Sequence, residues 1–457
     1  MRTILPKNLT KLALACQKAY QKPLYVVGGS VRDYLAEMHR NGTMDWDICS
    51  PLSADDFLKV ALECGLQAKS VFRHTGTVKL IDEENVEYEY TSFRSDKYVR
   101  GTHVPIEIFF TDDIALDARR RDFTCNAVYY DIQKDDFVDP LNGISAIKEK
   151  RLTTVDQAEK VFGEDGLRLM RLARQSSQLG FQPDNECFEG AKKNAALIKD
   201  ISPERIYAEL TAILSGDKKY GNENGPYEGV CLLHKTGVLA YIAPELTLGD
   251  GMEQRADFHK YDVLQHSLRA VKYADENIRL AALLHDVGKP FCKLRDGNSY
   301  QHPVEGARIA KEILTRWKAP NKTIHEVCAL VEWHMYDMNS MTKENKLRRF
   351  FVEHYPILQD LISLKQADFS ACMDDTSIAP TCERWTALLE RLHQEKAPLT
   401  LKELAISGQD ILQNVDVKAK HISTLLQQLL LHAVCNPKDN TKERLLCLAN
   451  GMAKTLQ

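Results

Sequence analysis

The spacing of hydrophobic and polar residues changes along the chain near a turn-forming stretch, DPLNG at residues 139–143. Before it, short apolar or alternating runs are separated by polar stretches, which is typical of β-strands with intervening helices. We expect a helix in DDFLKVALECG and strands in LYVV, TVKLI, VEYEYTSF, IEIFF and NAVYYDI. This part of the sequence predicts an α/β domain.

After the turn, strand signals nearly disappear, and apolar residues recur at i, i+3 and i+4, which predicts amphipathic helices. The clearest examples are GEDGLRLMRLARQSSQLGF, SPERIYAELTAILSG and YDVLQHSLRAVKYADENIRLAALLHD. We therefore predict an α/β head domain followed by an all-α neck and body and a second all-α domain. The expected divisions are residues 1–150, 151–245, 250–400 and 401–457.

The composition is that of a globular protein, with 44% hydrophobic and 27% charged residues among 457. No apolar run approaches the ~18 uncharged residues that a membrane span needs. The twelve cysteines are scattered without a CxxC pair, which argues against both a zinc knuckle and a disulfide framework. We expect a cytoplasmic protein with reduced, mostly buried thiols and no membrane partner.

The formal net charge of −4 does not by itself indicate a nucleic-acid-binding protein. Local basic strips nevertheless occur in one third of the chain: RRR at residues 119–121, KEKR at residues 148–151, and the series Arg168, Arg171 and Arg174. Any one of these strips alone is more typical of a solvated helix surface. Their meaning therefore depends on the motifs around them.

A glycine pair follows the first expected strand in the stretch YVVGGSVRD. Gly28 and Gly29 allow a tight turn with accessible backbone N–H groups, and we expect Ser30 to cap a helix that begins at Val31. Accessible N–H groups at the start of a helix can bind a phosphate, and Arg32 in the first turn would add charge-assisted hydrogen bonds to that phosphate. The stretch predicts a phosphate-binding turn.

Two aspartates flank a tryptophan shortly afterwards, at Asp45 and Asp47. Residues i and i+2 of an extended strand point to the same face, so these two carboxylates are expected side by side. Adjacent carboxylates repel each other unless a divalent cation lies between them, and Mg²⁺ accepts one or two carboxylates together with substrate phosphates. The pair predicts a magnesium site.

Four motifs then follow in order along residues 20–240, namely GGSVRD, DWD, RRDFTCNA and EDGLRLMR. In their order and spacing they resemble the class II tRNA nucleotidyltransferase and bacterial poly(A) polymerase family. The resemblance implies a catalytic head in residues 1–150 and a neck and body in residues 151–245 that select bases and bind RNA. The activity that it implies is template-independent nucleotide addition to an RNA 3′ end.

The resemblance also assigns roles to single residues. It implies that Asp45 and Asp47 hold the metal that aligns the primer 3′-hydroxyl with the α-phosphate, with Glu89 as a third carboxylate nearby. It implies that Asp122 lies close to the ribose. The nucleotide-binding residues that it implies are Gly28, Gly29, Arg32, Arg121, Asp122, Asp165, Arg168, Arg171 and Arg174.

The sequence departs from the family pattern in two places. Gly166 stands where the family often has proline, which is expected to make the start of that helix less rigid. The loop SDKYVRGTHVP at residues 95–105 lacks the acidic and arginine positions of close relatives.

Asp165 and Arg168 suggest base reading on chemical grounds. On one helix they would lie three residues apart and offer one acceptor beside a fork of donors. Cytosine and adenine each present an amino donor beside a ring-nitrogen acceptor, whereas uracil and guanine present a carbonyl beside a ring N–H. The pair therefore suits C and A, although an ordinary surface ion pair has the same spacing.

A second constellation begins with LLHDVGKP, where His285 and Asp286 end an apolar helix, a costly location for polar groups without partners. Other candidate ligands follow along the chain, and we interpret His334 among them as an ordinary core histidine. The segment resembles the HD phosphohydrolase family over residues 250–375. That resemblance implies a divalent metal (Ni, Mn, Co or Mg) bound by His266, His285, Asp286 and Asp368.

The function that these resemblances imply is addition of CCA to the tRNA 3′ end from CTP and ATP, with release of pyrophosphate. The HD domain would add hydrolysis of 2′,3′-cyclic or 3′ phosphates. A bacterial poly(A) polymerase is one alternative, because it uses the same chemistry. An HD phosphohydrolase with a non-catalytic RNA-binding front domain is another, and the oligomeric state is left open.

Overall fold

The computed structural model describes the chain except for residues 40, 43, 100–104 and 455–457, so part of the loop at residues 95–105 lies outside the described residues. The chain forms two compact units. The first comprises Met1–Thr247 with Arg316–Ala319, and the second comprises Leu248–Thr315 with Pro320–Gln457. Our finer division into four parts stays a prediction.

A seven-stranded mixed sheet forms the centre of the N-terminal part, in the order β3-β4-β5-β2-β1-β8-β9. Its strands are β1 (Tyr25–Val27), β2 (Trp46–Ser50), β3 (Gln67–Phe72), β4 (Thr77–Ile81), β5 (Glu87–Ser92), β8 (Tyr129–Asp131) and β9 (Asp136–Val138). Neighbours pair antiparallel except β2 and β5, which are parallel. The predicted α/β head is confirmed.

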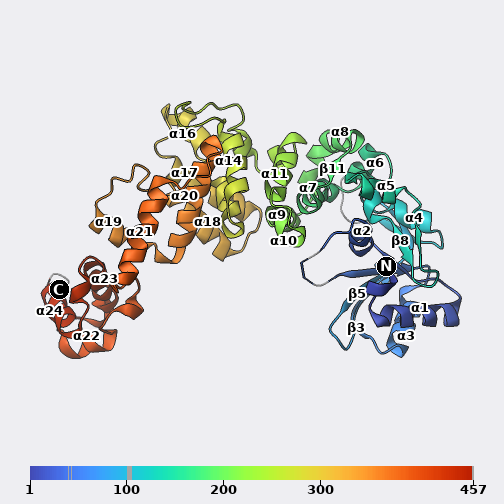
Figure 1. Ribbon diagram of the computed structural model, residues 1–457, viewed down its shortest axis with the longest axis horizontal. Helices are drawn as coiled ribbons and strands as arrows, with labels where there is room; N and C mark the ends of the chain where they lie inside the picture. Colours follow the sequence, from blue (N-terminus) through green and yellow to red (C-terminus); the bar gives the residue numbers. More distant parts are fainter. Residues whose placement is uncertain (40, 43, 100–104, 455–457) are drawn as a thin grey trace. The chain divides into compact units, whose positions relative to one another are not determined.

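Period-two alternation explains which face of the sheet is buried. On β5 the buried side chains of Tyr88 and Tyr90 alternate with outward Glu87 and Glu89. Tyr90 stacks on Phe57 with ring centroids 3.6 Å apart. Helix α3 (Ala54–Glu63) is thereby fixed to the sheet, and α1 (Lys7–Tyr20) lies beside α3 (Figure 1).

Three short helices complete the head: α2 (Gly29–Leu35), α4 (Ile114–Arg119) and α5 (Gly143–Lys148). Two strand pairs lie outside the large sheet: β6 (Arg94–Lys97) with β7 (Glu107–Phe110), and β10 (Arg151–Leu152) with β11 (Gln182–Pro183). The expected cap of α2 is wrong. The helix begins at Gly29 rather than Val31, and the buried hydroxyl of Ser30 makes no hydrogen bond within the described chain.

Helices form the remainder of the first unit, as predicted. They are α6 (Ala158–Glu164), α7 (Leu167–Leu179), α8 (Asn185–Asn194), α9 (Pro203–Leu214), α10 (Gly216–Tyr220), α11 (Gly225–Lys235), α12 (Leu239–Ile242) and α13 (Pro244–Thr247). Helix α7 is central and packs on α9, α10 and α11. Its polar residues therefore face the head, whereas its apolar residues are buried among helices.

The second unit is entirely helical in its described residues. It contains α14 (Val263–Tyr273), α15 (Arg279–Leu284), α16 (Lys289–Asp296), α17 (His302–Arg316), α18 (Asn321–Trp333), α19 (Glu344–Glu353), α20 (Leu358–Met373) and α21 (Pro380–Gln394). Helix α15 lies against α14, α18 and α20, and its Leu283 and Leu284 have no exposed surface. The end of α15 is therefore held deep inside this unit.

Helices α22 (Gly408–Asn414), α23 (Ile422–Ala433) and α24 (Lys442–Ala453) follow at the C-terminal end, drawn in red in Figure 1. They have a core of their own, which includes Ile411, Leu425 and Leu445. None of the described helices combines the length and the apolar character that a bilayer crossing requires. All twelve cysteines are free and eight are buried, as expected.

Candidate active-site cleft and histidine cluster

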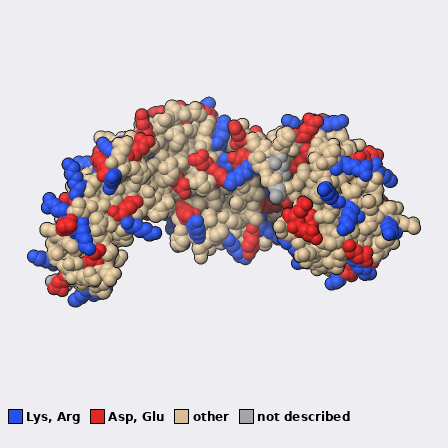
Figure 2. All heavy atoms as spheres, turned by 60° about the horizontal axis from the view of Figure 1, so that its bottom comes forward, with Lys and Arg blue, Asp and Glu red and all other residues tan. Residues whose placement is uncertain are grey.

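A polar cleft of about 460 Å³ lies within the first unit, where the head meets α7. Seven arginines and one lysine line it against five aspartates, so the lining is net positive. On the face shown in Figure 2, by contrast, basic and acidic side chains are interspersed. Of the residues predicted for the transferase site, the lining includes Gly28, Gly29, Arg32, Asp45, Asp47, Arg121, Asp122, Asp165, Arg168, Arg171 and Arg174.

The glycine turn after β1 is shaped around the second aspartate of the pair. β1 and β2 are antiparallel with Val27 opposite Asp47, and Gly28 has a positive φ of 82°. A Cβ atom on Gly28 would lie 2.9 Å from Oδ2 of Asp47. Only glycine combines this φ with this close approach, so the turn and the carboxylate form one local structure, with Asp45 directly before β2.

The electrostatics of Asp47 fit a cation site. Burial raises the pKa of this carboxyl from its ordinary value of 3.8 to about 6, Arg121 opposes the rise, and Glu89 and Asp45 add to it. A bound divalent cation would favour the ionised form, and carboxylate oxygens are the ligands that Mg²⁺ prefers. Asp45 and Asp47 thus fit Mg²⁺ by their chemistry.

Glu89 does not line the cleft. It lies opposite Asp47 in the parallel register of β2 and β5, but its side chain is about half exposed. Its Oε2 pairs with Nζ of Lys79 at 3.0 Å. A role beside the metal pair stays a prediction.

Arg32 lies in the cleft wall with its donors engaged. Its guanidinium donates to Asp33 Oδ1 at 2.6 Å, to Asn126 Oδ1 at 2.7 Å and to Tyr220 Oη at 2.9 Å. These partners come from α2, the segment before β8, and α10. Arg32 therefore ties three elements of the cleft wall together.

Arg121 is held in the cleft wall by residues of the head. Arg121 donates to Asp117 Oδ2 at 3.2 Å and lies over the ring of Tyr129. Although burial opposes it, Arg120 and Arg121 lower the pKa of Asp117 to about 2. The carboxylate of Asp117 therefore stays ionised and fixes both arginines at the cleft.

Asp122 connects the head to α7. Its Oδ2 lies 2.7 Å from Nη2 of Arg171 and accepts from Gln175 at 3.3 Å. Its Oδ1 accepts from Asn126 at 3.1 Å. Although burial opposes it, Arg171 lowers the pKa of this carboxyl. One turn further along α7, Arg174 pairs with Glu209 at 2.8 Å.

The expected geometry of Asp165 and Arg168 is wrong. Asp165 has extended backbone between α6 and α7, and its Oδ1 accepts from the backbone N–H of Leu167 at 2.9 Å. Gly166 lies so close to the Leu197 carbonyl oxygen that a Cβ there would approach it to 2.6 Å, and the chain breaks the helix at this point. Arg168 is on α7, so the two side chains do not share a helix face, although both line the cleft.

Four of the predicted residues converge in the second unit. Nε2 of His266 on α14 lies 2.9 Å from Asp368 Oδ1 on α20 and 3.1 Å from Nε2 of His285. Nε2 of His285 lies 3.3 Å from Oδ2 of Asp286. All four side chains are buried. The structure thus brings together the residues that the HD resemblance implies.

Two more histidines, His302 and His334, join this cluster. His334 is fully buried, and its interpretation as an ordinary core histidine stays a prediction. Nε2 of His334 lies 3.2 Å from Nε2 of His302 and 3.8 Å from Oδ1 of Asp286. The ammonium group of Lys365 donates to the His334 carbonyl oxygen at 2.6 Å and fixes the end of α18. We refer to His266, His285, Asp286, His302, His334 and Asp368 as the histidine cluster.

Burial and the two aspartates shift the pKa values of the histidines in this cluster in different directions. Although burial opposes it, Asp286 and Asp368 raise the pKa of His285 to about 10. Burial lowers the pKa of His334 to about 4. The two carboxylates therefore require positive charge beside them, and imidazole and carboxylate donors together fit a divalent transition metal.

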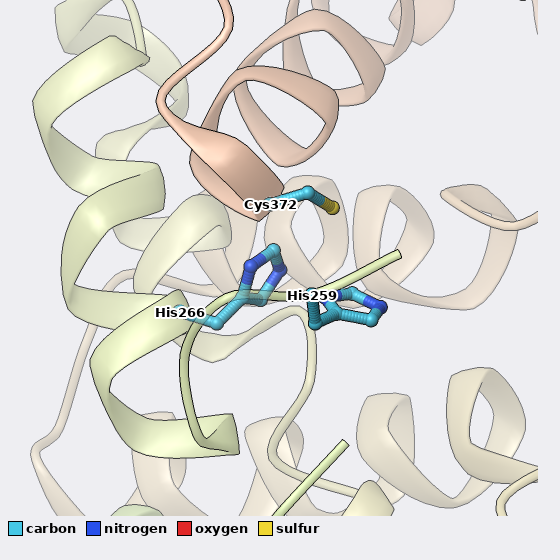
Figure 3. A group of neighbouring side chains, drawn as sticks. All are labelled: His259, His266 and Cys372. Carbon is cyan, nitrogen blue, oxygen red and sulfur yellow. The ribbon is translucent and has the colours of Figure 1, made fainter. Parts of the chain in front are cut away.

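His266 also lies beside two residues that the sequence analysis did not predict, His259 and Cys372. Figure 3 shows His259, from the loop before α14, and Cys372, from the end of α20, beside His266. One ligand atom from each lies within 4.8 Å of the others. Burial raises the pKa of the Cys372 thiol to about 12 and lowers that of His259 to about 4. Both shifts favour the uncharged forms of these two groups, which lie beside the histidine cluster at His266.

The chain is similar to known nucleotidyltransferases along most of its length. Residues 24–153 match the family model "Poly A polymerase head domain", and residues 180–248 match "Probable RNA and SrmB-binding site of polymerase A". A model of tRNA nucleotidyltransferase domain 2 matches residues 305–449. An A-adding tRNA nucleotidyltransferase of Deinococcus radiodurans is 30% identical over 369 residues, which cover 77% of each chain.

The chain belongs to the class II CCA-adding enzyme and poly(A) polymerase family. A CCA-adding enzyme of Geobacillus sp. strain WCH70 is 27% identical over 92% of this chain and 91% of its own. The crystal structure of Bacillus stearothermophilus CCA-adding enzyme in complex with CTP shares the fold, with a TM-score of 0.67, 23% identity and 99% of each chain covered.

Membership of this family confirms the resemblance drawn from the four motifs. The HD assignment of the second unit stays a prediction. Several residues of the transferase cleft were missed by sequence reasoning: Arg94, Asp96, Tyr98, Arg120, Asn126, Gln175, Gln178 and Lys219. Arg120 and Asn126 lie inside the RRDFTCNA motif, and Gln175 and Gln178 lie on α7 with Arg171 and Arg174, so these four had a local signal. Arg94, Asp96, Tyr98 and Lys219 belong to other segments that the fold brings to the cleft.

Proposed function

We propose that this protein adds CCA to the 3′ end of tRNA from CTP and ATP and releases pyrophosphate. The observation that carries the proposal is the pair Asp45 and Asp47 beside the Gly28 turn, inside an arginine-lined cleft. The names of the relatives, A-adding and CCA-adding enzymes, support the same activity. We further propose that the protein works in the cytoplasm.

Mg²⁺ held by Asp45 and Asp47 would supply Lewis-acid stabilisation of the transferring phosphoryl group. The chain's own residues do the rest. The net positive lining attracts the triphosphate and the RNA end. Arg121 and Arg171, each fixed by a buried aspartate, present guanidinium groups in defined positions, so little side-chain entropy is lost on binding.

For base selection, we assign Asp165 as the acceptor and Arg168 as the donor. Arg168 is held rigidly, because its guanidinium donates to the carbonyl oxygens of Val161 at 2.9 Å and Arg120 at 3.0 Å. Asp165 is anchored by the Leu167 N–H. A rigid pair of this kind leaves polar groups unmatched against U or G, which is the costly condition that gives discrimination.

The test of the activity is incorporation into tRNA that lacks CCA, with each nucleotide supplied singly and in combination. Addition of two C and then one A, followed by a stop, supports the proposal. Addition of a single A only to tRNA that already ends in CC would identify an A-adding enzyme. Unlimited addition of A would identify a poly(A) polymerase, and either result would overturn CCA addition.

Changing Asp165 is expected to alter base choice. Asp165→Asn keeps an oxygen that can accept from Leu167 but presents an amide in place of the second acceptor oxygen, so we expect discrimination against UTP and GTP to fall by ~10²-fold or more, or incorporation to stop. The measurement is kcat/KM for each nucleotide on the same tRNA. Glu159→Gln, on the exposed surface of α6, is the matched control. Unchanged selection of C and A in Asp165→Asn would place base reading elsewhere.

Replacing the first glycine is expected to damage the cleft without unfolding the head. In Gly28→Ala the new methyl group meets Asp47 Oδ2 in a backbone conformation that L residues rarely adopt, and we expect kcat/KM to fall by ~10²-fold, because small displacements of reacting groups are that costly. Gly65→Ala is a matched control, since Gly65 has a φ of 90° with nothing within 4 Å. It should lose comparable stability and keep activity. Equal activity in both variants would contradict the argument.

We propose a second activity for the second unit, metal-dependent hydrolysis of 2′,3′-cyclic or 3′ phosphates at the histidine cluster. The supporting observation is that buried nitrogen and carboxylate ligands converge there from α14, α15 and α20. A divalent metal (Ni, Mn, Co or Mg) bound by His266, His285, Asp286 and Asp368 would activate a water molecule. The alternative in which the front domain only binds RNA is disfavoured by its full set of cleft aspartates and arginines.

A further inference from the structure

Helix α10 is a helix of five residues that is fixed at both ends. Its first residue, Gly216, packs so closely on α7 that a Cβ atom there would lie 2.0 Å from Oγ of Ser177. The helix ends at Tyr220, because Gly221 follows with a φ of 73° and donates its N–H to the Asp217 carbonyl oxygen at 2.7 Å. The last side chain of α10 therefore has a defined position.

The head holds the end of α10 through the segment that joins α2 to β2. The backbone N–H of Asn41 donates to the Lys219 carbonyl oxygen at 2.9 Å, and its side-chain amide donates to the Lys218 carbonyl oxygen at 2.8 Å. This segment connects the glycine turn to the aspartate pair, and Lys219 itself lines the cleft. Helix α10 is therefore part of the cleft wall, although it comes from the helical part of the first unit.

Tyr220 places its hydroxyl between Arg32 and Asp33. Nη2 of Arg32 donates to Oη of Tyr220 at 2.9 Å, and Oη donates to Oδ2 of Asp33 at 2.8 Å. The other carboxylate oxygen of Asp33, Oδ1, accepts from Nε and Nη2 of Arg32 at 3.0 and 2.6 Å. The three side chains thus form a closed cycle of hydrogen bonds around a buried carboxylate.

Arg32 keeps one donor outside this cycle. A guanidinium group has five N–H donors. Three of them are directed to Asp33 and Tyr220, and a fourth, on Nη1, donates to Oδ1 of Asn126 at 2.7 Å. The second N–H of Nη1 has no partner among the residues that the structure describes, and Arg32 lines the cleft. Because the other four donors are held, this one keeps a single direction and is the donor available to an anion.

We infer that Tyr220 is a positioning residue of the transferase site, whose hydroxyl holds the Arg32 guanidinium in the orientation that binds the triphosphate of the incoming nucleotide. This inference rests on the proposed nucleotide addition and on the predicted role of Arg32 in it. Tyr220 does not line the cleft, so it acts through Arg32. A guanidinium that is already held in place loses little side-chain entropy when it binds an anion. The competing explanation is a structural contact that only ties α10 to the head.

The test is Tyr220→Phe, which keeps the ring and removes the hydroxyl. Oδ2 of Asp33 and one N–H of Arg32 then lose their partner, and we expect KM for the incorporated nucleotide to rise ~10-fold, since a hydrogen bond to a charged group is worth about this much. The value of kcat should stay within about threefold of wild type, because the phosphates are bound in the ground state and the transition state alike. The inhibition constant of inorganic pyrophosphate should rise with KM, whereas the choice between bases should not change.

The matched control is Tyr88→Phe. The hydroxyl of Tyr88 donates to Oδ2 of Asp82 at 2.7 Å, so it belongs to another buried tyrosine–aspartate pair of the head, and neither residue lines the cleft. This variant should lose comparable melting temperature and keep the wild-type KM and inhibition constant. A contact that is only structural predicts the same kinetics for both variants.

A double-mutant cycle then determines whether Tyr220 acts through Arg32. In an Arg32→Lys background the guanidinium is absent and the positive charge beside Asp33 is kept. Adding Tyr220→Phe to this background should raise KM less than ~2-fold, because coupled residues do not contribute additively. A full additional increase would overturn the inference.

The remaining outcomes separate this inference from the proposed function. An unchanged KM and inhibition constant in a folded Tyr220→Phe variant would overturn the inference and leave nucleotide addition as it stands. A Tyr220→Phe variant that does not fold, or that loses kcat at constant KM, would assign the hydroxyl to the fold and overturn it as well. A wild-type protein that adds no nucleotide would overturn the proposed function together with the inference. Circular dichroism and the melting temperature establish folding.

Discussion

Asp47→Asn is expected to lower the rate of nucleotide addition by ~10³-fold or more while the head stays folded. The substitution keeps the size and shape of the side chain, so the Gly28 turn is not disturbed. What it removes is one of the two negative charges that would hold Mg²⁺, and a metal that clamps a phosphoryl group contributes several kcal/mol to the transition state. The measurement is single-turnover incorporation of CTP into tRNA that lacks CCA.

The same variant has a predicted effect on stability in the absence of Mg²⁺. Burial raises the pKa of Asp47 from 3.8 to about 6, so the folded state holds this proton more tightly than the unfolded state. The wild-type protein therefore loses stability from this group as pH rises from about 4 to beyond 6, and Asp47→Asn does not. We expect the melting temperature of the variant to gain on that of the wild type over this pH range.

A matched control is Glu87→Gln on β5, a strand that neighbours β2, where the carboxylate is exposed and pairs with Lys69. It should keep both activity and the pH dependence of stability. Near wild-type incorporation by Asp47→Asn would refute the role given to the pair. A variant that is inactive and also much less stable than the wild type at pH 7 would mean that the carboxylate supports the fold rather than the chemistry.

The transferase cleft was largely predictable because its main parts are local in sequence. A strand, a glycine turn and an i, i+2 carboxylate pair each follow from short-range rules, and β1 and β2 bring Gly28 and Asp47 together by simple antiparallel pairing. Period-two alternation likewise marked β5. The predicted functions of these residues stay proposals, whereas their convergence on one cleft is a property of the fold.

The errors came from tertiary contacts that no local pattern contains. The segment around Asp165 has helical periodicity on both sides, but close packing of Gly166 on Leu197 interrupts the helix there. Serine is a typical helix-capping residue, yet α2 begins at Gly29, one residue before Ser30, and its N-cap is Gly28. The proximity of His334 to His302 was not predicted either, because the two residues lie thirty-two positions apart in the sequence. Long-range convergence of this kind is visible only in the folded chain.

The histidine cluster leads to the second large expected effect, in which hydrolysis and nucleotide addition are lost separately. The wild-type protein should hydrolyse 2′,3′-cyclic phosphates only when a divalent metal such as Ni²⁺ or Mn²⁺ is present. His285→Gln should lower that rate by ~10²-fold or more, because Nε2 of His285 is one of the ligand atoms closest to Asp286. The same variant should add nucleotides to tRNA within about threefold of the wild-type rate, since Asp45 and Asp47 belong to the other unit and a change of this size is only ~0.7 kcal/mol.

The control for this experiment must separate chemistry from folding, because His285 is fully buried. Asp368→Asn, on α20, removes a different ligand of the same ion and keeps its volume, so two folded variants with the same loss of hydrolysis would point to the metal. His325→Gln, on the exposed side of α18, should keep both activities. A wild-type protein without metal-dependent hydrolysis would make the cluster a structural hydrogen-bond network. Loss of nucleotide addition in a folded His285→Gln variant would mean that the two units depend on each other, because a carboxylate site in the head has no other reason to respond to a buried histidine in the second unit.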